Sequence, residues 1–141
     1  MANYYCAIRT NYFQVKDPKQ FRQFMSHTCG VNSSMQLWER KNANGQTVFG
    51  FGADFGISCL QDALDIDEAG CNAFICGLQQ HVQEEDAVII LEIGQEKLCY
   101  LVGSAMIITC NGHEYLDISD LAQARAATML NNPGWQTQLD Y

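Results

Sequence analysis

The sequence predicts an α+β fold with a mainly antiparallel sheet, in the ferredoxin-like β-α-β-β-α-β order, followed by an added C-terminal hairpin and helix. Three observations indicate this fold. Short apolar segments are typical of strands, two other stretches show helical periodicity and a third is rich in Ala, and Gly- or Asn-containing turns separate neighbouring segments. The chain has 141 residues, of which 48% are hydrophobic. This size and composition predict a single compact α+β domain over residues 1–141.

The first predicted strand and helix follow one another closely. Tyr4–Tyr12 is aromatic and β-branched and contains no breaker, so it predicts a strand. A helix is predicted to begin near Asp17, which can cap it, because Pro18 suits the first helical position. Gly30 is its expected end. One face of this helix carries apolar or small side chains at helical spacing, namely Phe21, Phe24, Met25 and Thr28.

A hairpin and a second helix are predicted next. Met35–Lys41 and Thr47–Ala53 are strand-like segments on either side of the turn sequence Asn42–Gly45. A second helix is expected to begin at Asp65 or Asp67. Its predicted apolar face consists of Cys71, Phe74, Ile75, Leu78 and Val82.

The longest apolar signal follows and predicts a meander of three strands. Ala87–Ile93 contains one charged residue, which is typical of a strand covered on both faces. Gly94-Gln95 is expected to end this strand. Lys97–Val102 and Ala105–Cys110 continue the meander, with an interruption at Gly103-Ser104 where a bulge or a close backbone approach is expected.

The chain is predicted to end in a hairpin strand and a helix. Asn111-Gly112 favours a type I′ turn that leads into a strand over Glu114–Ile118. A third helix is expected over Leu121–Leu130, capped by Ser119 or Asp120.

The cysteines and the N-terminus indicate the compartment. Seven cysteines are an odd number, none are at Cys-x-x-Cys spacing, and the N-terminal residues lack the pattern of a signal peptide. We therefore expect reduced thiols, a cytoplasmic location and, without an 18-residue apolar run, no membrane span. No cofactor or metal is predicted, because the histidines and cysteines lack ligand spacing. We expect no enzyme; a thiol activity using His27 and Cys29 is the alternative.

The charge is unevenly distributed along the chain, which has a net charge of −8. Residues 1–41 carry six basic and two acidic side chains, whereas residues 42–141 carry two basic and fourteen acidic ones. A solvated acidic surface is the simplest interpretation. The functional hypothesis is a surface that binds a basic protein partner. Its predicted residues are Asp62, Asp65, Asp67, Glu68, Glu84, Glu85 and Asp86.

The alternative hypothesis is binding of single-stranded nucleic acid. Gly50-Phe51-Gly52 is similar to the middle of the strand-three signature of the RNA-recognition motif, a ferredoxin-like domain. The basic residue expected before Gly50 is Phe49 instead, and Ala53 and Asp54 follow Gly52. The residues expected to bind in this case are basic or aromatic and lie in the first strand and the hairpin: Tyr4, Arg9, Tyr12, Arg40 and Lys41.

Most of the chain resembles small acidic proteins carried on bacterial mobile elements. The resemblance rests on Tyr4–Phe13, the Phe21–Met25 helix and the Val48–Gly52 strand. It implies an inhibitor of host defence of the anti-CRISPR or anti-restriction type, many of which mimic nucleic acid, and it assigns no residue roles. The leading hypothesis is a non-enzymatic inhibitor that occupies a basic site on a nucleic-acid-handling protein and does not itself bind nucleic acid. A homodimer is compatible with this hypothesis.

Overall fold

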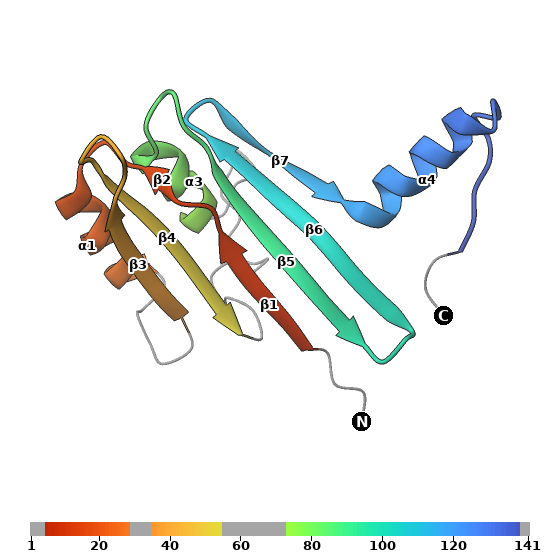
Figure 1. Cartoon of the computed structure of the whole chain (residues 1–141), viewed down its shortest axis with the longest axis horizontal. Coiled ribbons are helices and arrows are strands. Elements are labelled where there is room, and N and C mark those ends of the chain that lie inside the picture. Colours follow the sequence, from red (N-terminus) through yellow and green to blue (C-terminus); the bar gives the residue numbers. More distant parts are fainter. Residues whose placement is uncertain (1–4, 29–34, 55–72, 139–141) are drawn as a thin grey trace.

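A computed structural model of the chain describes residues 5–28, 35–54 and 73–138 (Figure 1). Within these residues the fold is α+β, with an antiparallel seven-stranded sheet and three helices. The strands are β1 (Tyr5–Thr10), β2 (Phe13–Gln14), β3 (Met35–Lys41), β4 (Thr47–Asp54), β5 (Val88–Glu96), β6 (Tyr100–Thr109) and β7 (Gly112–Asp117), and the helices are α1 (Pro18–Thr28), α3 (Ala73–His81) and α4 (Ile118–Met129).

The strands lie side by side in the order β3-β4-β1-β5-β6-β7, and the short β2 pairs with β4 on the same side as β1. The register places Arg9 of β1 opposite Gly52 of β4 and opposite Leu91 of β5. Because directly opposed residues of antiparallel strands point to the same side, these registers assign every strand residue to one of two faces.

The covered face of the sheet packs against α1 and α3. Phe21 and Met25 of α1 and Phe74 and Leu78 of α3 are almost fully buried in one cluster with side chains from the strands. Phe21 meets Phe13 edge to face at 5.6 Å between ring centroids. The opposite face, called the open face below, is not covered by either of these helices (Figure 1).

The predicted first strand is interrupted at Asn11. Its side chain accepts a hydrogen bond from the Ile89 N–H at 2.8 Å and donates to the Ala87 carbonyl at 3.0 Å. The side-chain amide of Asn11 therefore hydrogen-bonds the backbone at the start of β5. The side-chain alternation of β1 shifts by one residue at this point. As a result, Phe13 returns to the core while Tyr12 lies on the open face.

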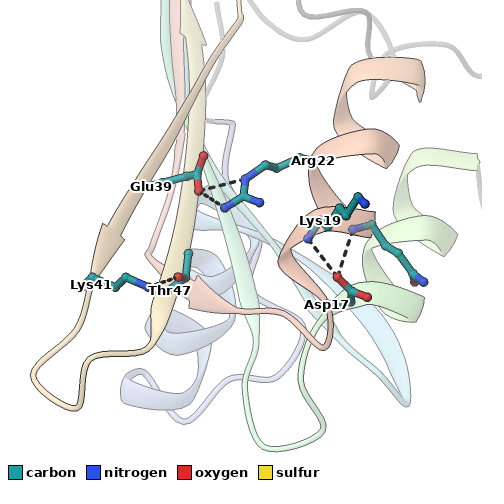
Figure 2. A network of polar contacts seen from close by, with 7 residues as sticks. Asp17, Lys19, Arg22, Glu39, Lys41 and Thr47 are labelled. Atoms are coloured by element: carbon teal, nitrogen blue, oxygen red, sulfur yellow. Dashed lines mark hydrogen bonds and ion pairs between the residues drawn. The ribbon is translucent and has the colours of Figure 1, made fainter.

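The boundaries predicted for β3 and the predicted starts of β4 and α1 are confirmed, whereas the expected end of α1 at Gly30 lies outside the described residues. Asp17 caps α1, since its carboxylate accepts from the N–H groups of Lys19 and Gln20 at 3.0 and 3.2 Å (Figure 2). The predicted start of the second helix, at Asp65 or Asp67, lies outside the described residues.

The interpretation of β5 as a strand covered on both faces is wrong. Leu91 and Ile93 are 47% and 62% exposed, because they point to the open face, which α1 and α3 do not reach. Gly94-Gln95 does not end the strand either, since both residues pair with β6 and the strand continues to Glu96.

Two further local predictions need correction. The β6–β7 turn consists of Cys110 and Asn111, neither of which has a positive φ, so the turn is not type I′. The cap of α4 is Asp117 rather than Ser119 or Asp120, because the Asp117 carboxylate accepts from the backbone N–H groups of both these residues.

The expectation of reduced thiols throughout is also wrong. Cys76 is disulfide-bonded, and its partner lies outside the described residues. Cys99 and Cys110 are free thiols, and Cys6 is buried. The odd cysteine count could not show this pairing, because one disulfide leaves the remaining cysteines free.

Candidate nucleic-acid interface

The open face brings together two arginines and two aromatic rings from β1, the β1–β2 link and β3. Arg9, Tyr12, Trp38 and Arg40 form this group, which we call the arginine–aromatic platform. The Arg40 guanidinium lies 3.9 Å from the centroid of the Tyr12 ring, and the Arg9 guanidinium lies 5.0 Å from that of Trp38. Both distances are within the range of a cation–π interaction.

Two glycines of β4 make room for these rings. Gly50 and Gly52 alternate with the buried Phe49 and Phe51, so a side chain at either glycine would point to the open face. A Cβ atom on Gly52 would lie 2.8 Å from Cη2 of Trp38, and one on Gly50 would lie 3.4 Å from Cδ1 of Tyr12. The aromatic rings therefore rest directly on the glycine backbone, as the close approach expected of a glycine-rich strand requires.

The guanidinium groups of Arg9 and Arg40 donate no hydrogen bond to any described residue, so their N–H donors are available. An arginine that stacks on a ring uses the face of its planar group, whereas its N–H donors lie in the plane and point outward. Among the described residues, neither Arg9 nor Arg40 has a carboxylate within ion-pair distance, and both are exposed. The platform can therefore accept an anion from solvent.

The basic residues on the covered side of the sheet are engaged differently (Figure 2). Arg22 of α1 donates to the Glu39 carboxylate of β3 at 2.6 Å, and this hydrogen bond lowers the pKa of Glu39 below its ordinary value. Lys41 donates to the Thr47 hydroxyl at 2.7 Å. Lys41 shares its face of β3 with Glu39, so it does not join the platform.

The structure thus gathers three of the five residues predicted for nucleic-acid binding. Arg9, Tyr12 and Arg40 meet on the open face, Lys41 lies on the other, and Tyr4 is outside the described residues. Trp38 was missed. The alternation along β3 could have identified it, because Trp38 is two residues from Arg40 and shares its face.

The residues predicted for the acidic surface are only partly described. Asp62, Asp65, Asp67 and Glu68 lie outside the described residues. Glu84 and Glu85 are exposed on the turn between α3 and β5.

Asp86 has a structural role that the sequence did not indicate. Its two carboxylate oxygens accept hydrogen bonds from the backbone N–H of Gln14 at 2.7 Å and of Ala87 at 2.8 Å. Asp86 is half-buried and joins β2 to the start of β5. A change at Asp86 would therefore disturb the fold as well as the surface charge.

The basic and acidic side chains are separated in space as well as along the chain. The described residues up to Asp54 carry six basic and three acidic side chains, whereas those from Ala73 onward carry two basic and eight acidic ones. Strands β3, β4 and β1 lie at one end of the sheet, and β5, β6 and β7 at the other (Figure 1). A local cationic field at the platform is thus separated from most of the described carboxylates, and screening over about 8 Å at physiological salt limits their influence.

His81 gives the fold a pH dependence. Its ring packs against both Phe21 and Phe24, with centroid distances of 5.9 and 4.9 Å. Burial lowers the pKa of His81 below its ordinary 6.5; the charge of Lys16 acts in the same direction, and Asp17 opposes it.

Because the unfolded chain binds a proton at His81 more readily than the folded chain, stability is expected to fall as the pH drops below about 6.5. Urea unfolding between pH 8 and pH 5 measures this change, and the variant His81→Gln removes the His81 contribution. Equal pH slopes in the wild type and the variant would contradict the expectation.

No family model, curated protein sequence or solved structure matches this chain. Among the described helices, none is long and apolar enough to cross a membrane.

Proposed function

We propose that the arginine–aromatic platform binds single-stranded nucleic acid. The observation that carries the proposal is the pair of arginines over aromatic rings, neither of which forms an ion pair with a described residue. A guanidinium fork matches two oxygens of a phosphate, and such charge-assisted hydrogen bonds are stronger than neutral ones. Tyr12 and Trp38 remain half-exposed. Their accessible ring surface can stack on bases, an interaction worth about 1–3 kcal/mol per base.

The strand arrangement supports this proposal. We assign the first part of the chain to the ferredoxin-like order, because β3, β4, β1 and β5 lie side by side in that sequence with α1 and α3 on one face. In RNA-recognition motifs, the uncovered face of such a sheet stacks bases on aromatic side chains. Trp38 and Tyr12 lie on the open face over Gly52 and Gly50, which supports the proposal.

The test is a titration of labelled single-stranded RNA and DNA, about 12 nucleotides long, followed by fluorescence anisotropy at low salt. The double variant Arg9→Gln/Arg40→Gln is expected to bind about 100-fold more weakly, since each lost charge-assisted hydrogen bond costs about 1.5 kcal/mol.

The matched control is Lys16→Gln/Lys19→Gln. It makes the same change in net charge at two exposed side chains near and within α1, away from the open face. This control is expected to lose less than about threefold in affinity, because screened charges at a distance contribute little. Equal losses in both double variants would show a general charge effect, and no binding by the wild type would end the proposal.

The acidic inhibitor inferred from the resemblance to mobile-element proteins is the second candidate, with a cytoplasmic location. It is supported by Glu84 and Glu85, which are exposed and form no ion pair with any described residue. Such an inhibitor would bind a basic protein and no oligonucleotide, so the same titration separates the two candidates.

A further inference from the structure

The C-terminal part of the sheet exposes an unusual amount of apolar surface. Eleven large hydrophobic side chains are exposed in the described residues, and ten of them lie between residues 91 and 130. Single exposed apolar residues are normal, but a contiguous group marks an interaction site.

Part of this surface forms an apolar groove of about 260 Å³ between the open face and α4. Gly103 lets α4 approach the sheet, since a Cβ atom there would lie 2.9 Å from Cγ2 of Ile118. The groove is lined chiefly by Leu91, Ile93, Ala105, Leu116, Ile118 and Leu121.

Helix α4 leaves its larger apolar side chains largely exposed. Ile118, Leu121 and Met129 are 62%, 52% and 79% exposed, whereas the buried residue of the helix is the small Ala127. The helix extends beyond the end of the sheet (Figure 1). A 12-residue helix gains most of its stability from burying an apolar face, which α4 does not do within one chain.

We infer that a second copy of this chain covers the groove, with α4 of each copy packing over the groove of the other. One chain carries both complementary parts, so a two-fold axis makes the contact twice and closes the assembly. Homodimer interfaces are more apolar than transient interfaces, and the surface formed by the groove and α4 is apolar. A standard interface uses about 20–30 residues per partner.

Charge complementarity favours the same occupant. Arg125 lies on the exposed side of α4 with Leu121 and Met129, and it forms no ion pair with a described residue. Glu114 is exposed on the open face two residues before the groove residue Leu116. When α4 of one copy packs over the groove of the other, the proposed contact brings Arg125 towards Glu114 of the second copy.

The experiment measures particle mass by sedimentation and light scattering from about 1 to about 100 µM, the range in which interfaces of moderate affinity dissociate. A dimer has twice the 15.8 kDa mass of the chain. Leu121→Asp, and independently Met129→Asp, is expected to give monomers with an unchanged circular dichroism spectrum. Leu98→Asp is the matched control, because Leu98 is 82% exposed in the β5–β6 turn outside the groove.

A charge exchange tests the orientation. Arg125→Glu is expected to raise the dimer dissociation constant by about tenfold, and Glu114→Arg combined with Arg125→Glu is expected to restore it. A monomeric wild type at all concentrations, or a dimer that survives both Leu121→Asp and Met129→Asp, would overturn the inference. Arg9→Gln/Arg40→Gln should still dimerise, so failure of nucleic-acid binding and failure of dimerisation are distinguishable.

Discussion

Replacing Gly52 with alanine is expected to destabilise the protein by about 3 kcal/mol, at the upper end of the cost of overpacking. The new Cβ atom would lie 2.7 Å from the Ile8 carbonyl oxygen of β1 and 2.8 Å from the Trp38 ring. The first of these neighbours is backbone in the middle of the sheet and cannot move without separating β1 from β4. The second can move only by leaving the platform. Urea unfolding at pH 7.5 or above, where His81 is neutral in both states, measures the loss.

The matched control for this change is Gly50→Ala in the same strand. Its Cβ atom would lie 3.3 Å from the Asn11 carbonyl oxygen, a contact that small shifts can relieve. We expect it to cost less than about 1 kcal/mol. In a double-mutant cycle, Trp38→Ala should recover only the part of the Gly52→Ala loss that comes from the ring. A Gly52→Ala variant as stable as wild type would mean that Trp38 does not rest on β4 in solution.

The same substitution connects stability with the proposed function. Arg9 lies opposite Gly52 in the register, and its guanidinium stacks on Trp38. Displacing the ring therefore removes the support of one arginine as well as one stacking surface. Oligonucleotide binding should fall in Gly52→Ala at temperatures where the variant remains folded, whereas Gly50→Ala should retain binding by Arg9 and Trp38.

Local signals in the sequence predicted the elements that are stabilised by residues close together in the chain. Asp17 and Pro18 define the start of α1, and Phe21 and Met25 on its apolar face are fully buried. The turn between β3 and β4 is closed by Asn42, whose side-chain oxygen accepts hydrogen bonds from two backbone N–H groups within the turn. These features depend on residues close together in the chain, so a single sequence contains the information.

The exposure of a strand is a different kind of property. The run from Ala87 to Ile93 has the composition of a strand buried on both faces, yet Leu91 and Ile93 are exposed. Whether a helix covers a given face depends on long-range packing, and composition does not show it. An apolar run can equally indicate a surface that binds a partner, which is the interpretation we give to the groove beside α4.

The candidate site was only partly predictable, because long-range packing also decides which of its residues meet. Arg9, Tyr12 and Arg40 were identified by residue type, but their meeting depends on β4 lying between β3 and β1. The interruption at Asn11 also moves Tyr12 to the open face, against the simple alternation of the strand. Neither the strand order nor this shift can be derived from the composition of the segments.

Replacing Gly77 with alanine is expected to destabilise the protein by about 2 kcal/mol, although alanine is the better helix former by about 1 kcal/mol. Gly77 lies within α3 where this helix meets α1, and a Cβ atom there would overlap the Phe24 ring. That ring is held in place by its neighbours: it stacks on Phe74 at 6.0 Å and lies 4.9 Å from His81. It therefore cannot turn aside without losing these contacts.

The sign of the Gly77→Ala effect should reverse when the Phe24 ring is absent. In a Phe24→Ala background the overlap is gone and the helix preference remains, so Gly77→Ala is expected to stabilise that variant by about 1 kcal/mol. Urea unfolding of the two single variants and the double variant measures both effects. If Gly77→Ala stabilised the wild-type chain, helix propensity alone would account for the result. That outcome would contradict the close contact between Gly77 of α3 and Phe24 of α1. A loss of equal size with and without Phe24 would instead indicate that a different neighbour limits the space at Gly77.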